Sequence, residues 1–130
     1  LLSERKRVFN QYNNAFIKLS WPILPPSESN EKETSYHLYA LRINEISEIQ
    51  RDAIIDKIAQ KGVAVNVHFI PMPMLTFFKE QGYDIKKYPQ SYKNYACEIS
   101  LPIYSQLTND QVSYIIDSVI NAYETIIIVK

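Results

Sequence analysis

The chain has 130 residues, of which 14 are basic and 14 acidic, so its formal net charge is zero. This length allows one compact domain with a hydrophobic core, and a hydrophobic content of 46% excludes intrinsic disorder. The balanced charge argues against nucleic-acid binding, because the neutralisation of phosphates needs clustered lysine and arginine. No apolar run has membrane-spanning length, so we expect no membrane partner.

The numbers of cysteines, glycines and histidines exclude several kinds of binding and catalytic sites. Cys97 is the single cysteine, so a reducing cytoplasm fits, and its apolar neighbours favour packing over a nucleophilic role. The two glycines, Gly62 and Gly82, are too few for a phosphate-binding loop. The two histidines, His37 and His68, are too few for a zinc site. Taken alone, the residues contain no complete catalytic set, and we nominate neither a catalytic residue nor a metal ligand.

The N-terminal quarter is predicted to be a helix followed by a connector. Residues 3–19 place apolar side chains at helical spacing. Residues 21–34 contain three prolines and then a polar, charged stretch, which predicts an exposed connector. We therefore expect a division into residues 1–34, the leading helix and Pro-rich connector, and residues 35–130, an α/β domain.

A β-α-β unit is predicted next. Residues 36–43 are rich in β-forming side chains. Ser47 and Gln50 form a capping-box pattern for a helix that runs to Lys61 and ends before a glycine. Residues 63–69 predict the following strand, so we expect a right-handed crossover between two strands of one sheet.

The C-terminal half is predicted to contain three helices and one more strand. Short helices are expected at residues 75–81 and 89–97, and a strand at residues 99–101. Thr108 opens the final helix, and the apolar run at residues 126–129 should pack on the domain or on a partner chain. Together these elements predict an α/β fold: a small mixed three-stranded sheet with flanking helices.

The end of the strand predicted at residues 63–69 is the most informative place in the sequence. His68 and Phe69 close a β-rich run, and Pro71 and Pro73 stop the strand and stiffen the loop beyond it. From the residues alone, a buried histidine satisfied by backbone groups is favoured over a ligand contact. Arg42 on the preceding strand could bind an anion, although a surface ion pair is the favoured interpretation.

Several sequence blocks occur in a characteristic order: Tyr36-His37-Leu38-Tyr39, Gly62 to Pro71, Gly82-Tyr83, Tyr88-Pro89, Ile99 to Tyr104 and Leu107-Thr108. In this order they resemble the C-terminal portion of the DegT/StrS family of pyridoxal-phosphate-dependent sugar-nucleotide aminotransferases. The resemblance covers roughly residues 5–123.

This resemblance implies the small C-terminal domain of a fold type I aminotransferase. An N-terminal large domain would bind pyridoxal phosphate and carry the Schiff-base lysine, and this chain alone would hold no cofactor. The complete enzyme would move an amino group from glutamate to a nucleotide-linked keto sugar, in surface polysaccharide or amino-sugar biosynthesis. It would work as a cytoplasmic homodimer.

The resemblance also implies the site residues. His68, Phe69, Pro71 and Met72 become candidate substrate-binding residues, whereas Pro73 stands where many family members have a second histidine. A non-catalytic binding or dimerisation module with the same fold is the alternative. An unrelated small α/β ligand-binding domain is a third interpretation, which the ordered blocks disfavour.

Overall fold

A computed structural model describes residues 1–128 and is built on one three-stranded sheet. The strands, in spatial order, are β1 (Pro22–Ile23), β2 (Tyr39–Ile43) and β3 (Glu98–Leu101). The helices are α1 (Leu2–Phe16), α2 (Glu48–Gln60), α3 (Thr76–Glu80), α4 (Pro89–Ala96) and α5 (Asn109–Tyr123). These elements confirm the predicted α/β fold with a three-stranded sheet and flanking helices.

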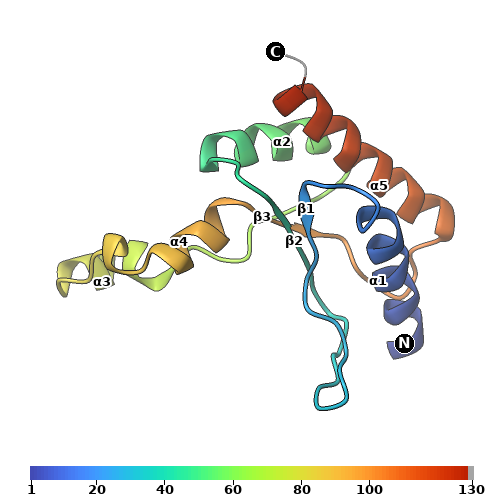
Figure 1. The fold of residues 1–130 in the computed structure, drawn as a ribbon, viewed down its shortest axis with the longest axis horizontal. Helices are drawn as coiled ribbons and strands as arrows, with labels where there is room; N and C mark the ends of the chain where they lie inside the picture. The colour runs from blue at the N-terminus through green and yellow to red at the C-terminus, as the bar shows by residue number, and fades with distance from the viewer. Residues whose placement is uncertain (129–130) are drawn as a thin grey trace.

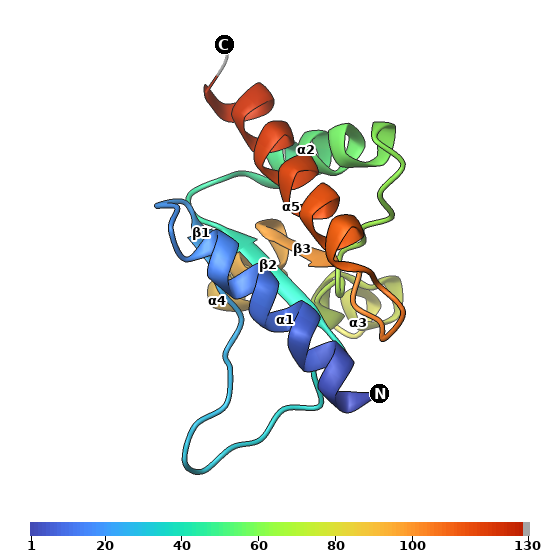
Figure 2. The same ribbon diagram turned by 90° about the vertical axis from the view of Figure 1, so that its right-hand side faces the viewer.

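One face of the sheet carries the hydrophobic core. Strands β2 and β3 are antiparallel, and their register pairs Tyr39 with Leu101 and Leu41 with Ile99. Because side chains alternate across a strand, all four lie on one face, and Leu41 and Ile99 are fully buried. Helices α1 and α5 lie against this side of the sheet, with α2 beyond its end (Figures 1 and 2).

The opposite face of the sheet is polar. The same register pairs Ala40 with Ser100 and Arg42 with Glu98, so these four residues point away from the core. On that side, α4 and α3 extend away from the sheet (Figure 1). The strand alternation thus separates a packed face from a face that is available for other contacts.

Residues 63–69 do not form the predicted strand. Only Asn66 pairs with the sheet, through two backbone hydrogen bonds of 2.7 and 3.2 Å with Ser100. Beyond it, the Asn66 side chain accepts the Val67 N–H at 2.8 Å, and a carboxylate oxygen of Glu98 accepts the His68 N–H at 2.8 Å. Side chains thus take the donors that would have extended the ladder, and the chain turns away.

The sheet is therefore antiparallel rather than mixed. Strand β3 lies between Asn66 and β2, and every pairing among residues 1–128 is antiparallel. The expected pair of full strands joined by a crossover helix is wrong, since the second one shrinks to a single bridge at Asn66.

The predicted connector begins with a strand that the sequence did not reveal. Pro22 and Ile23 pair with Ile43 and Arg42 at the edge of the sheet, where a proline without an N–H is tolerated. Trp21 stacks on Tyr123 of α5, with ring centroids 4.0 Å apart. Residues 21–23 are thus partly buried, and the expectation that they are exposed is wrong. The domain division after residue 34 stays a prediction, although α1 contributes to the same core as residues 35–128.

The predicted helix boundaries agree with the structure where capping signals were present. Ser47 with Gln50, and Thr108 with Gln111, form complete capping boxes at the starts of α2 and α5. In the C-terminal run, Ile126 and Ile127 pack against the core, Ile128 is exposed, and residue 129 lies outside the described residues. None of the described helices is long and apolar enough to cross a membrane.

The buried tyrosines of the core predict a loss of stability at alkaline pH. Tyr12 donates to the Pro102 carbonyl at 2.6 Å and Tyr39 donates to Asn13 Oδ1 at 2.8 Å, and burial raises the pKa of both phenols above the usual 10. Unfolded tyrosines therefore ionise first, so their contribution to stability is complete below about pH 10 and is lost as the pH rises further. We expect the free energy of unfolding in urea to fall as the pH rises above about 10, and to fall less steeply in Tyr39→Phe. Equal slopes for both proteins would contradict this account.

Candidate functional site

Residues 69–95, here called the arm, project from the polar side of the sheet (Figure 1). No side chain in the arm is buried, although the segment carries many large apolar groups. Those with substantial exposure are Phe69, Ile70, Met72, Phe77, Tyr83, Tyr88 and Tyr92. The arm is thus an apolar surface without a buried core of its own.

A cavity of about 480 Å³, here called the sheet cavity, lies where the arm joins the sheet. Its floor is the polar sheet face, with Ala40, Arg42 and Glu98. One wall is the loop with His68, Phe69 and Pro71, a second is α4, and a third is the proline pair at residues 25–26. Three of the four predicted site residues are therefore brought together in one hollow.

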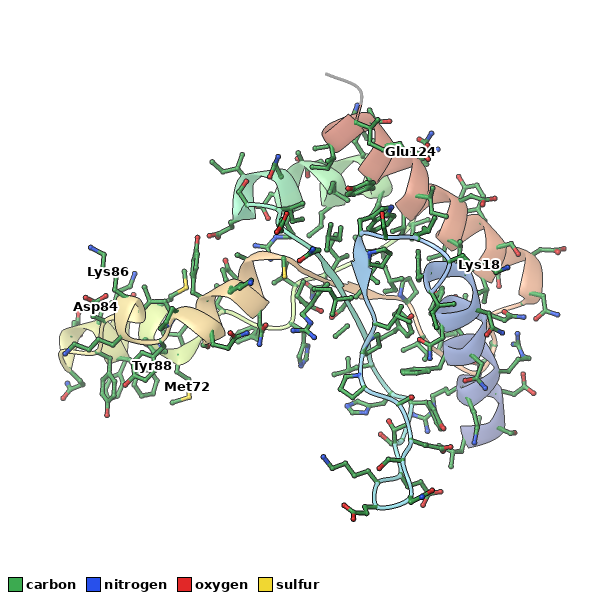
Figure 3. All side chains as sticks on the ribbon, in the orientation of Figure 1. Lys18, Met72, Asp84, Lys86, Tyr88 and Glu124 are labelled. Carbon is green, nitrogen blue, oxygen red and sulfur yellow. The ribbon has the colours of Figure 1, made fainter. Side chains whose placement is uncertain are left out.

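The fourth predicted residue, Met72, lies in a neighbouring hollow on the arm. This second cavity, of about 330 Å³, is lined by Met72, Pro73, Phe78, Tyr83 and Tyr88, together with Ser91 of α4. Met72 and Tyr88 lie close together on the arm (Figure 3). Since Ser91 also lines the sheet cavity, the two hollows adjoin.

His68 is exposed at the wall of the sheet cavity, and the interpretation as a buried core histidine is wrong. Its backbone N–H is the group that is fixed, by the hydrogen bond to Glu98, and its peptide bond to Phe69 is cis. The Phe69 ring beside it is 68% exposed. An imidazole and an aromatic face are thus both available to a ligand at this wall.

Glu98 supports the loop from below. It is 5% exposed, and its two carboxylate oxygens accept hydrogen bonds from the Ser100 hydroxyl at 2.6 Å and from the His68 N–H at 2.8 Å. A buried carboxylate with two short donors is well satisfied, so it holds the start of the loop in one place. Sequence patterns do not reveal Glu98, because the predicted strand begins one residue later, at residue 99.

Arg51 of α2 binds the backbone of two residues that line the sheet cavity. Its guanidinium donates to the carbonyls of Tyr95 at 2.6 Å and of Glu98 at 3.4 Å, and lies 4.8 Å from the centre of the Tyr95 ring. The side chain is 1% exposed, and its carboxylate partners are Glu48 and Asp52 at the protein surface. This cation therefore ties α2 to the junction of α4 and β3.

Tyrosine hydroxyls provide a second tie between α4 and α2. The two oxygens of the Glu48 carboxylate accept hydrogen bonds from Tyr95 at 2.6 Å and Tyr92 at 3.0 Å. Burial, followed by this hydrogen bond, raises the pKa of Tyr95, and the hydrogen bond to Glu48 is the main cause that raises the pKa of Tyr92. Both phenols therefore remain protonated donors at neutral pH.

Arg42 lies on the cavity floor and does not form the ion pair that the sequence favoured. Its Nη1 donates to Asn94 Oδ1 of α4 at 2.9 Å. None of the four ion pairs found among residues 1–128 includes Arg42. Arg42 and Asn94 are about 50 residues apart in the chain, so the alternation along the strand could not predict this contact.

The side chains at the site are suited to binding a ligand. The sheet cavity presents a guanidinium, an imidazole and an aromatic ring, and no described group of His, Cys, Asp and Glu side chains could hold a metal ion. Cys97 is buried at the C-terminal end of α4, and burial raises the pKa of its thiol, which agrees with a packing role. Fold and site together define a small α/β domain with an open hollow whose lining combines polar and apolar side chains.

The family follows from comparison with known proteins. The model of the DegT/DnrJ/EryC1/StrS aminotransferase family matches residues 1–120, and the chain therefore belongs to that family. The chain is 32% identical to the uncharacterised protein MJ1066 of Methanocaldococcus jannaschii over 117 residues, which are 88% of this chain and 30% of that protein. It is 25% identical to the spore coat polysaccharide biosynthesis protein SpsC of Bacillus subtilis, over 88% of this chain and 30% of SpsC.

A solved structure agrees with these sequence matches. Spr1654 from Streptococcus pneumoniae, a provisionally named sugar aminotransferase, superposes with a TM-score of 0.94 and 34% identity. The match covers 98% of this chain and 32% of Spr1654. The chain thus spans about a third of the length of the relatives it matches.

Proposed function

We propose that this chain is the substrate-facing small domain of a pyridoxal-phosphate-dependent aminotransferase. The complete enzyme transfers an amino group from glutamate to a nucleotide-linked keto sugar, in surface polysaccharide or amino-sugar biosynthesis. The observation that carries the proposal is the family match over residues 1–120, together with the close superposition on Spr1654. A larger N-terminal domain supplies the cofactor.

The sugar substrate is supported by the names of two relatives. Spr1654 is named as a sugar aminotransferase, and SpsC as a protein of spore coat polysaccharide biosynthesis. The sheet cavity suits such a substrate, because a guanidinium, an imidazole and an exposed ring can bind charged, hydroxyl-bearing and flat groups respectively. We propose that His68, Phe69 and Pro71 contact the sugar nucleotide, with Met72 at the edge of its site.

Pyridoxal phosphate is supported by Spr1654, whose structure is known in PLP and PMP forms. Within residues 1–128, however, no lysine lines the sheet cavity or the neighbouring hollow on the arm. The residues present there do not fit covalent attachment of the cofactor, so we derive no chemical step through it. We propose that the anchoring lysine is supplied by the larger domain.

The arm supports the proposal of a partner. It exposes apolar rings along its length, and an apolar surface of this kind usually marks a contact with another protein surface. We propose that the larger domain and a second subunit cover it in a homodimer. The cytoplasmic location suggested by the single cysteine stays a prediction.

A non-catalytic module with the same fold is the second candidate, favoured by the same exposed arm, which would suit dimerisation. The two candidates differ in one experiment, which supplies cofactor, glutamate and a nucleotide-linked keto sugar. We expect the chain alone to give neither an amino sugar nor a stoichiometric lysine adduct after borohydride reduction, and the complete protein containing it to give both. A defined lysine adduct on the chain alone would contradict the proposal that the larger domain supplies the cofactor-binding lysine. A cofactor-loaded complete protein that makes no amino sugar would favour the module.

A further inference from the structure

We propose that Arg42 is an oxyanion-binding residue of the sheet cavity, which takes a phosphate or carboxylate group of a ligand. The inference rests on the proposed function only for the identity of the ligand. Three observations support the site itself. Arg42 lies on the floor of the cavity, Asn94 orients its guanidinium, and no acidic side chain pairs with its charge within residues 1–128.

The position of Arg42 follows from the strand register. The neighbours of Arg42 in β2, Leu41 and Ile43, are fully buried in the core, so Arg42 must point to the opposite, polar face. That face is the floor of the sheet cavity, and the side chain is half-buried there. A cation held on a rigid strand inside a hollow is placed for a ligand more definitely than one on a mobile surface loop.

One hydrogen bond orients the Arg42 guanidinium and leaves most of its N–H donors available. Its hydrogen bond to Asn94 Oδ1 engages Nη1, and Asn94 Oδ1 is itself held by Gln90 at 3.1 Å. A guanidinium has about five N–H donors in a planar fork that matches the two oxygens of a carboxylate or phosphate. Within residues 1–128, no other side-chain hydrogen bond engages it. The remaining donors are therefore available to a ligand.

Glu98 is the acidic group that faces the same cavity, and its charge opposes an anion. Its carboxylate is not paired with Arg42, although the two residues are opposite each other in the sheet. Both of its oxygens already accept hydrogen bonds, from Ser100 and from His68. Because Glu98 is 5% exposed and occupied in this way, it leaves the charge of Arg42 without a direct partner.

Two parts of the proposed reactants carry such an oxyanion. One is the diphosphate of a nucleotide sugar, and the other is a carboxylate of the amino donor. Arginine binds both in the same bidentate geometry, so the shared chemistry is an oxygen pair with negative charge. The cavity volume of about 480 Å³ lies in the range that binds small molecules and leaves room for either group.

Two anions used as separate probes test the inference on residues 1–130. Inorganic pyrophosphate and glutamate are titrated while the NMR signals of the Arg42 Nε–H and the Asn94 side-chain amide are followed. We expect saturable shifts with at least one anion: pyrophosphate alone identifies the phosphate source, and glutamate alone identifies the carboxylate source. No saturable shift with either anion would overturn the inference.

Charge-matched variants distinguish a specific anion site at Arg42 from nonspecific attraction of anions to positive side chains. Arg42→Gln should weaken binding about tenfold or more, and Arg42→Lys, which keeps the charge but loses the fork, should weaken it by less. Arg5→Gln is the control, since Arg5 is also half-buried and outside the four ion pairs but lies on α1, away from the cavity. Equal losses in Arg42→Gln and Arg5→Gln would overturn the inference. The two proposals can fail separately. If anion binding depends on Arg42 but the complete protein aminates no sugar, the proposed function is refuted and the anion site is still supported.

Discussion

Replacing Arg51 with methionine should lower the free energy of unfolding by about 3 kcal/mol, the largest effect we expect from a single substitution. Arg51 is 1% exposed, and its guanidinium donates to two backbone carbonyls, of Tyr95 and Glu98. Methionine fills much of the same volume but leaves both carbonyls and the Glu48 carboxylate without this cation. Urea unfolding followed by circular dichroism measures the change.

Asp52→Asn is the matched control for Arg51. It removes the other carboxylate that pairs with the same guanidinium, at 2.7 Å, but the Asp52 side chain is 60% exposed. Water screens such a pair, so the loss should stay below about 1 kcal/mol. If Arg51→Met cost no more than Asp52→Asn, the carbonyl contacts could not be what holds α4 and β3 to α2.

In the complete enzyme, His68→Ala should raise the KM for the nucleotide-linked sugar about tenfold while leaving the glutamate half-reaction unchanged. The imidazole is exposed at the wall of the sheet cavity, and losing one hydrogen bond to a charged or polar ligand group costs a factor of this size. Separate kinetics of the two half-reactions show which substrate is affected.

His37→Ala is the control for His68. This other histidine is also exposed, interacts with the Ser35 hydroxyl at 2.7 Å and does not line the sheet cavity. It should leave both half-reactions unchanged. An equal loss in both half-reactions for His68→Ala, or no loss in either, would count against a substrate-binding role.

Local signals in the sequence predicted the helices well. The capping boxes at Ser47 and Thr108 and the glycines after two helices act on neighbouring residues, and the structure places these helix ends as predicted. Gly62 and Gly82 both have positive φ, of 76° and 87°, the left-handed conformation that glycine adopts at helix ends.

Contacts between distant segments could not be predicted in the same way. Residues 63–69 have the composition of a strand, but Glu98, about 30 residues later in the chain, takes the His68 N–H and ends the pairing after Asn66. Arg42 was expected to form an ion pair, because nothing in the sequence shows that the nearest partner is the amide of Asn94. Both errors concern the partner of a polar group, which tertiary structure decides.

Only part of the candidate site could be predicted, because the rest depends on contacts between segments that are distant in the sequence. His68, Phe69 and Pro71 are consecutive or nearly so, and therefore line the same wall of the sheet cavity. The floor and the far wall come from β2, β3 and α4, which meet only in the folded chain. The sequence indicates Arg42 as a possible anion ligand, whereas no local pattern indicates Glu98 or Asn94.

Transfer of ¹⁵N from labelled glutamate tests the central claim most directly. The complete protein that contains this chain is loaded with pyridoxal phosphate and given ¹⁵N-glutamate and a nucleotide-linked keto sugar. Our account predicts a nucleotide-linked amino sugar that carries the label, at a rate reduced by His68→Ala and unchanged by His37→Ala. A cofactor-loaded protein that forms no labelled amino sugar would contradict it.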